Sequence, residues 1–200
     1  MKRCLALLGA LLASRSAHGQ VVHPWFVYLR DGGRSPLYVF ASYSFGHPVV
    51  MAGTIVDTPN DYTEYLAGAG VNLLAANGSG ATVLALGSKA TDSWYVELYG
   101  LPNVTRGPLT ATGFAGLYLP LQTQGVHQYF LDPVTLLYRL HPQLAVGGSY
   151  SGYKVEGFPA RHGAGPAVQV TFPSGSVTLD ALAGIANFTE ELRLTLQVVF

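Results

Sequence analysis

Hydrophobic residues recur with a period of two along many short segments of this chain. In the segment 192–200 (LRLTLQVVF), every second residue is leucine, valine or phenylalanine, with Arg193, Thr195 and Gln197 between them. This alternation is typical of β-strands whose two faces meet different environments, and no long segment has the 3.6-residue period of an amphipathic helix. The sequence therefore predicts an all-β protein. The same alternation occurs at residues 94–99, 136–140, 168–172 and 177–180.

Turn-forming sequences separate the alternating segments. Short connections (GHP, NGSG, HPQ and PSG) alternate with longer or more polar ones (DTPND, SKATD, GFPARHGAG and ANFTEE). Tight turns at one rim and looser loops at the other predict an up-and-down antiparallel barrel. The expected strands lie near residues 21–30, 36–45, 48–56, 62–76, 80–87, 93–100, 113–122, 127–140, 143–155, 166–173, 176–184 and 190–200.

One segment does not fit this alternation of connections. Residues 100–113 (GLPNVTRGPLTATG) read as a long loop on the side of the tight turns. A single miscounted strand would explain the misfit. Barrels of eight or ten strands therefore remain alternatives to the twelve-stranded barrel that the expected strands predict.

The chain carries few charges for its length. Charged residues are 11% of 200 residues, against about 25% in an average soluble domain. An apolar face that meets lipid needs no charge, and a closed barrel removes the unpaired edge that the segment 192–200 would leave in water. We therefore expect a transmembrane β-barrel. Eleven basic and eleven acidic residues balance, which does not favour a nucleic-acid partner.

The second face of the strands is expected to line the barrel lumen, where charged side chains would have to pair. The opposite face of the last strand would meet hydrocarbon, so Leu194→Arg is expected to destabilise the barrel more than Arg193→Leu. The candidate lumen-lining residues are polar or charged members of alternating segments: Glu64, Asn72, Glu97, Arg139, Gln169, Asp180 and Arg193.

The first residues read as a secretory signal. A basic start (MKR) precedes a short apolar run (CLALLGALLA), and small residues (SAHG) stand before Gln20. We expect residues 1–19 to be removed and residues 20–200 to form a single barrel domain. Because Cys4 is the one cysteine of the sequence, the mature chain would contain no disulfide and no cysteine-based zinc site.

These features together resemble the bacterial outer-membrane β-barrel proteins. The resemblance rests on the signal, the alternating strands and the segment 192–200 with its terminal aromatic residue. It implies location in the outer membrane, contact with the lipid bilayer and insertion by the barrel-assembly machinery. It indicates no specific family of channel, enzyme or adhesin. The residues that it implies as the assembly signal are Leu192, Leu194, Leu196, Val198 and Phe200.

The expected function is a passive pore or a structural role in the cell envelope, without enzymatic activity. One alternative is a soluble secreted or periplasmic protein, a β-sandwich or a lipocalin-like binder of an apolar ligand. Another is a barrel-wall hydrolase of lipids or peptides. Its candidates are Ser149, Ser151 and His162, although the segment 147–152 (GGSYSG) does not fit the nucleophile motif G-x-S-x-G.

Other chemistry leaves little trace in the sequence. The histidines lack metal-ligand spacing and no phosphate-binding glycine loop occurs, so we expect no metal and no cofactor. The basic sequence ARHG, at residues 160–163, falls in an expected outer loop. Anionic lipopolysaccharide is a candidate partner for that loop.

Overall fold

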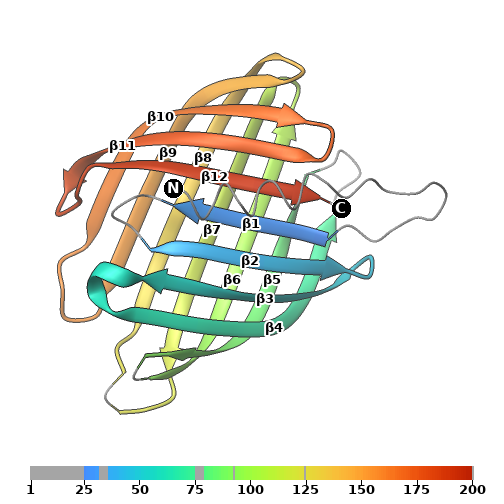
Figure 1. The fold of residues 1–200 in the computed structure, drawn as a ribbon. Helices are drawn as coiled ribbons and strands as arrows, with labels where there is room; N and C mark the ends of the chain where they lie inside the picture. The colour runs from blue at the N-terminus through green and yellow to red at the C-terminus, as the bar shows by residue number, and fades with distance from the viewer. Residues whose placement is uncertain (1–24, 32–35, 75–78, 92, 124, 200) are drawn as a thin grey trace.

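The computed structural model describes residues 25–31, 36–74, 79–91, 93–123 and 125–199, and these residues form twelve antiparallel strands (Figure 1). The expected signal, residues 1–19, lies outside the described residues. The strands are β1 (Trp25–Asp31), β2 (Leu37–Ser44), β3 (Pro48–Asp57), β4 (Tyr62–Leu74), β5 (Gly80–Ala90), β6 (Trp94–Arg106), β7 (Leu109–Pro120), β8 (Gln128–His141), β9 (Leu144–Val155), β10 (Arg161–Phe172), β11 (Gly175–Ala186) and β12 (Glu191–Val199).

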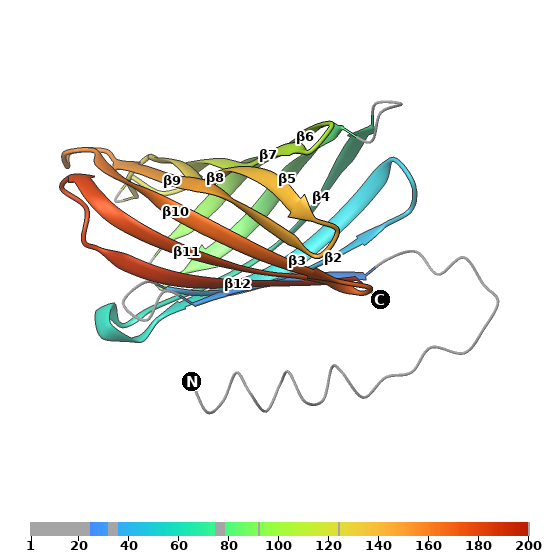
Figure 2. The ribbon, with the colours of Figure 1, turned by 90° about the horizontal axis from the view of Figure 1, so that it is seen from above.

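The strands close into a barrel. Each strand pairs with its neighbours in the sequence, and β12 pairs with β1 to complete the wall (Figure 2). The predicted twelve-stranded, up-and-down antiparallel barrel is confirmed, and the eight- and ten-stranded alternatives are wrong. No helix among the described residues is long and apolar enough to cross a membrane.

Connections of two kinds alternate around the barrel. At one rim, which we call the short-turn rim, residues 107–108 alone join β6 to β7, and Gly107 has a φ of 60°, in the left-handed region that favours glycine. At the other rim, the loop rim, the 3-10 turn η1 (Thr58–Asn60) joins β3 to β4. The connections from β7 to β8 and from β11 to β12 also lie at the loop rim.

The expected long loop at residues 100–113 is wrong. These residues form the end of β6 and the start of β7, so that Asn103 pairs with Gly80 on one side and with Thr112 on the other. Backbone hydrogen bonds hold the strands together whether or not side chains alternate in polarity. The lack of alternation therefore concealed two strand ends joined by a tight turn.

The loop expected at residues 157–165 is also shorter than predicted, because β10 begins at Arg161. The small residues here are needed for close strand packing, since a Cβ on Gly165 would lie 1.7 Å from the carbonyl oxygen of Ala181 on β11. The glycine-rich segment 161–165, whose composition is typical of a loop, thus belongs to a strand. Arg161 to Gly163, expected in an outer loop, lie in the sheet.

The outer face of the wall is apolar. Toward the loop rim, Tyr65, Trp94 and Tyr129 add exposed aromatic rings, and Lys89 Nζ lies 5.6 Å from the centroid of the Trp94 ring. Aromatic side chains at a rim are typical of barrels that cross a membrane. The exposed aliphatic side chains of this face include Val50, Val71, Val83, Leu98, Leu131, Leu136, Val168, Val170, Leu179 and Leu194.

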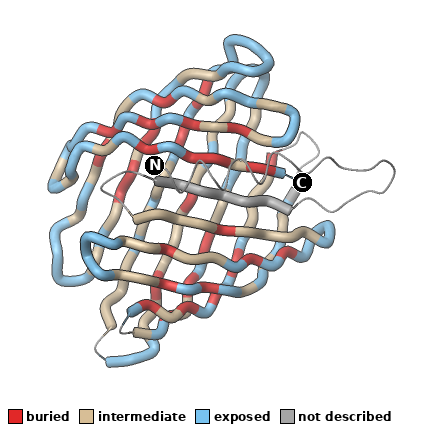
Figure 3. Tube along the Cα trace, viewed as in Figure 1, coloured by how far each residue is buried: buried red, intermediate tan, exposed pale blue. Residues whose placement is uncertain are grey.

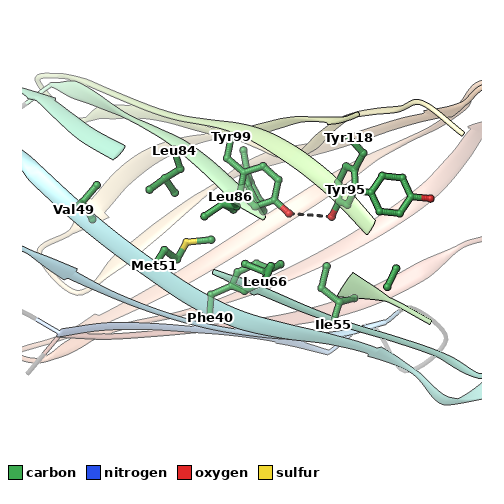
Figure 4. Packing of buried hydrophobic residues seen from close by; sticks show 12 residues of the cluster. Phe40, Val49, Met51, Ile55, Leu66, Leu84, Leu86, Tyr95, Tyr99 and Tyr118 are labelled. Atoms are coloured by element: carbon green, nitrogen blue, oxygen red, sulfur yellow. Dashed lines mark hydrogen bonds between the residues drawn. The ribbon is translucent and has the colours of Figure 1, made fainter. Parts of the chain in front are cut away.

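The inner face is buried, and buried and exposed positions alternate along the strands (Figure 3). From β2 to β7 the buried side chains are mainly apolar and form the cluster drawn in Figure 4. From β8 to β12 many are polar: Thr135, Ser149, Ser151, Ser176, Thr178, Asp180, Arg193 and Thr195. The lumen therefore has one mainly apolar half and one largely polar half.

Candidate functional site

Aromatic side chains from distant parts of the wall meet inside the lumen. Phe40 on β2 packs edge-on against Phe114 on β7, with ring centroids 6.2 Å apart, and Phe114 lies 4.9 Å from both Tyr99 and Phe130. The hydroxyl groups of Tyr99 and Tyr118 are 2.9 Å apart (Figure 4). Edge-to-face geometry is favourable for such rings. These five residues, which we call the aromatic bridge, narrow the lumen.

A second contact crosses the lumen through Arg193 on β12, which is 3% exposed. Its Nη1 donates to Asp132 Oδ1 on β8 at 2.6 Å, and its Nη2 donates to Ser151 Oγ on β9 at 3.3 Å. Its Nε donates to Glu191 Oε2, and its Cζ lies 5.6 Å from the centroid of the Phe188 ring. Two carboxylates, a hydroxyl and an aromatic ring thus surround one guanidinium group.

Two carboxyl groups are buried in the mainly apolar half. Glu64 on β4 and Glu97 on β6 are each 0% exposed, with the buried Ser88 on the strand between them. They are close enough to interact electrostatically. Tyr62 donates from its hydroxyl to Glu64 Oε2 at 2.7 Å. Glu64 Oε1 has no hydrogen-bond partner among the described residues, which is costly for a buried polar atom.

A cavity of about 650 Å³ opens inside the loop rim, and we call it the vestibule. The aromatic bridge contributes Tyr99, Phe114, Tyr118 and Phe130 to its wall. Its volume suits a small solute. The charged residues that line it are Asp57, Glu64, Asp132, Arg161, Glu191 and Arg193.

Two of the candidate lumen residues lie at the short-turn rim, away from the vestibule. Asn72 Nδ2 donates to Ser44 Oγ at 2.9 Å, and Thr82 Oγ1 donates to Asn72 Oδ1 at 2.6 Å. Arg139 is exposed, and its Nη2 donates to the carbonyl oxygen of Gly107 at 3.1 Å. The structure therefore places these side chains in the hydrogen bonding of the rim.

Gln169 and Asp180 lie on the largely polar half of the wall. Gln169 Nε2 donates to Thr178 Oγ1 at 3.0 Å. Asp180 is 2% exposed and stands opposite Arg193 in the register of β11 and β12. The structure thus gathers Glu64 and Arg193 at the vestibule, places Asn72 and Arg139 at the short-turn rim and leaves the other candidates along the wall.

The candidate assembly segment forms the closing strand. Leu192 and Leu194 are 61% and 50% exposed, whereas Leu196 and Val198 are 8% and 7% exposed. Phe200 lies outside the described residues. The four described residues therefore differ in exposure, although they occupy alternate positions of one strand.

The candidate hydrolase residues do not meet. Ser149 and Ser151 are buried on the inner face, and Ser151 contacts Arg193. His162 is hydrogen-bonded through Nδ1 to the hydroxyl of Tyr150 at 2.7 Å, and Tyr150 stands between the two serines in β9, so its side chain points to the opposite face. No nucleophile–base pair results from these residues.

An exposed pair links two loops at the loop rim. His127 Nδ1 and Glu156 Oε2 are 2.8 Å apart, and the His127 backbone N–H donates to the same oxygen at 3.2 Å. The hydrogen bond with the His127 ring and the one from its backbone lower the pKa of Glu156.

Sequence reasoning missed several residues of the vestibule. Asp132 lies before Pro133 inside the expected strand 127–140, and Glu191 ends the loop sequence ANFTEE at the start of the expected strand 190–200, but neither stands out as a polar residue of an alternating segment. The aromatic bridge gives no local signal, because Phe40 and Phe114 are distant in the sequence. Its only trace was the high aromatic content of 12%.

Solved structures with a similar fold are bacterial outer-membrane proteins. The KdgM porin, solved in complex with disordered oligogalacturonate, has a TM-score of 0.58 at 7% identity, over 88% of this chain and 98% of that chain. Omp33 of Acinetobacter baumannii has a TM-score of 0.55 at 13% identity, over 90% and 100%. The NanC porin has a TM-score of 0.53 at 10% identity, over 89% and 98%. No family model and no curated protein sequence matches the chain.

The fold is that of a small porin barrel. At these identities the likeness concerns the fold alone, and it agrees with the outer-membrane β-barrel class that the sequence resembles. A soluble sandwich or lipocalin-like fold is not favoured, because the closed twelve-stranded barrel carries its large apolar side chains on the outer face. The similar structures named here are porins or outer-membrane proteins by description, which is consistent with a protein that is not an enzyme.

Proposed function

We propose that the protein is a small barrel of the bacterial outer membrane that provides a narrow passive channel. The observation that carries this proposal is the polarity of the wall, with exposed apolar residues outside and a vestibule of charged and tyrosine residues inside. Membrane barrels have this arrangement because lipid contacts one face and water the other. The likeness to porin folds supports the same function.

Two observations favour a second candidate, a structural barrel that conducts nothing. The aromatic bridge joins β2 to β7, and Arg193 joins β12 to β8, so side chains cross the lumen at two places. A channel would need a path beside these contacts, or their transient opening. The distinction is whether current flows through the barrel.

Single-channel recording in planar bilayers tests the proposal with the refolded barrel and with Phe114→Ala. The wild-type protein should give small steps of current, and Phe114→Ala should give larger ones, because it removes the ring at the centre of the aromatic bridge. Leu136→Ala is the matched control, since Leu136 is 55% exposed on the outer face. It should leave the step size unchanged.

Truncation of a buried ring costs about 3–5 kcal/mol, so Phe40→Leu is a milder second variant on the other side of the bridge. Current steps that are absent from all four proteins would identify a structural barrel. Steps that are unchanged in both bridge variants would show that the conducting path avoids the bridge.

The route to the membrane belongs to the same proposal. Residues 1–19 would direct export and be removed, and residues 20–200 would be the mature barrel. The barrel-assembly machinery would read the segment that ends in Phe200. Lipopolysaccharide would contact the end of the barrel that lies in the outer leaflet. Arg161 begins β10 and lines the vestibule, so it would contribute less to that contact than a residue in a free loop.

A further inference from the structure

The vestibule carries an excess of negative charge, although the whole chain is neutral. Four of the residues that line it are acidic, Asp57, Glu64, Asp132 and Glu191, and two are arginines, Arg161 and Arg193. Charges of one sign in a cleft with low-dielectric walls raise the local concentration of ions of the opposite sign. The vestibule should therefore attract cations.

Arg193 shows how this environment accommodates a guanidinium group. The group donates hydrogen bonds to Asp132, Glu191 and Ser151, and its Cζ lies 5.6 Å from the centre of the Phe188 ring. Carboxylates with a nearby aromatic face are favourable surroundings for a cation. Asp132 and Glu191 are both engaged with Arg193, whose single charge offsets one of their two negative charges.

The other acidic pair lies on neighbouring strands and has no cationic partner among the described residues. Asp57 ends β3 and Glu64 lies in β4, where Asp57 pairs with Tyr62 and Glu64 pairs with Ile55. Asp57 Oδ1 and Glu64 Oε1 have no hydrogen-bond partner in the described part of the chain. The other oxygens accept from Asn60 Nδ2 at 2.6 Å and from Tyr62 at 2.7 Å.

Aromatic residues complete this wall. Tyr38 and Tyr62 line the vestibule together with Asp57 and Glu64. Glu97 adds a further buried carboxyl group within electrostatic range of Glu64. Arg161, the remaining base of the lining, pairs in register with Tyr153 on β9 and therefore belongs to the other side of the vestibule.

We propose that the wall formed by Asp57, Glu64, Tyr38 and Tyr62 binds small organic cations with a guanidinium or ammonium group. The cation would lie between the carboxylates of Asp57 and Glu64, just as the guanidinium group of Arg193 bonds Asp132 and Glu191. Anions of similar size would be disfavoured there. This inference deepens the proposed function and rests on it, since it names the class of solute that the channel admits.

Methylguanidinium chloride is the first probe, used with the full refolded barrel. Isothermal titration calorimetry in detergent should give saturable binding, and acetate should give none. In planar bilayers, a methylguanidinium chloride gradient should give a reversal potential with the sign of cation preference. In Asp57→Asn/Glu64→Gln, binding should weaken about tenfold or more, and the reversal potential should move toward zero.

Glu156→Gln is the matched control, because Glu156 is an exposed carboxylate at the same rim that does not line the vestibule. It should change binding less than about twofold. Asp57→Asn alone is the milder variant if the double variant does not refold, as judged by heat-modifiable gel migration. Its binding should fall between those of the wild type and the double variant.

The outcomes separate this inference from the proposed function. Current with anion preference or with no preference, or binding that is equal in wild type and double variant, would overturn the cation site and leave the channel standing. Binding of methylguanidinium by a barrel that never conducts would overturn the channel and leave the site standing.

Discussion

Arg193 joins β12 to two strands across the lumen, β8 and β9. Its replacement should lower the stability of the barrel strongly. Arg193→Leu would remove the shared cation of Asp132 and Glu191, whose side chains are 14% and 15% exposed. Breaking a buried ion pair from one side costs about 3–5 kcal/mol, against about 2–4 kcal/mol for an arginine placed in hydrocarbon. We therefore expect Arg193→Leu to destabilise the barrel at least as much as Leu194→Arg, the reverse of the order expected from alternation.

A urea titration of the barrel in lipid vesicles measures both variants. The triple variant Arg193→Leu/Asp132→Asn/Glu191→Gln should recover much of the loss, because no charge is then left without its partner. A smaller loss of unfolding free energy in Arg193→Leu than in Leu194→Arg would contradict the central role of the ion pair.

The His127–Glu156 pair makes one loop contact dependent on pH. Because hydrogen bonds with His127 lower the pKa of Glu156, the contact stabilises the folded rim above the pKa of the unfolded carboxyl group. That stabilisation is lost as the pH falls through the lower, folded value. Limited proteolysis of residues 121–127 should therefore speed up under acid. Glu156→Gln should remove this acid-dependent step, and a step that persists in it would assign the effect to another group.

At the scale of elements, β12 closes the barrel, because it pairs with β11 on one edge and with the first strand, β1, on the other. It pairs with β11 through eight residue pairs that run from Gly175–Val198 to Leu182–Glu191, and with β1 on its other edge. In a closed barrel this strand has no free edge. An open barrel would leave the backbone groups of β1 and β12 unpaired in lipid, which is costly.

Deletion of Phe200 tests whether the end of the sequence is also an assembly signal. One terminal ring contributes only about 1.5–3 kcal/mol of burial, so refolding into detergent should remain largely intact. Insertion into the outer membrane of cells should fall. The measurement compares outer-membrane yield with refolded fraction for the deletion and for Leu194→Asp/Leu196→Asp, which should impair both. Normal insertion of the deletion variant would show that Phe200 is not part of an assembly signal.

At the scale of the whole molecule, the barrel exposes large apolar side chains on its outer face and buries several charged side chains inside. Side chains such as Leu136, Ile185 and Leu192 are more than half exposed, whereas Glu64, Glu97 and Arg193 are buried. A contiguous apolar surface of this kind requires lipid or detergent. The charge-poor composition, with 11% charged residues, has its physical reason here.

The mature chain should therefore fractionate with outer membranes and require detergent for extraction. On gels it should migrate differently before and after boiling, because a barrel closed by hydrogen bonds on every strand resists detergent at room temperature. Recovery as a soluble monomer from periplasm or medium would contradict the membrane barrel. Cytoplasmic expression without residues 1–19, followed by refolding, provides the unfolded and folded references for the gel.

The sequence by itself determined the twelve strands, the antiparallel order and the alternation of short and long connections. A period of two ties each residue of a strand to one face, and turn residues mark where strands end. Where the alternation is absent, the predicted strand boundaries are wrong. Asn103 and Gly165 lie in strands because backbones of neighbouring strands supply their partners, and no local pattern reports this.

Only the tertiary structure decided what meets inside the lumen. Alternation indicates a face but not an opposite wall, because the distance across a barrel depends on strand number, tilt and register together. Asp132 and Arg193 are 61 residues apart, and they meet because β8 and β12 face each other at the same height. Phe40 and Phe114 meet for the same reason, so the vestibule and its charges arise from barrel closure.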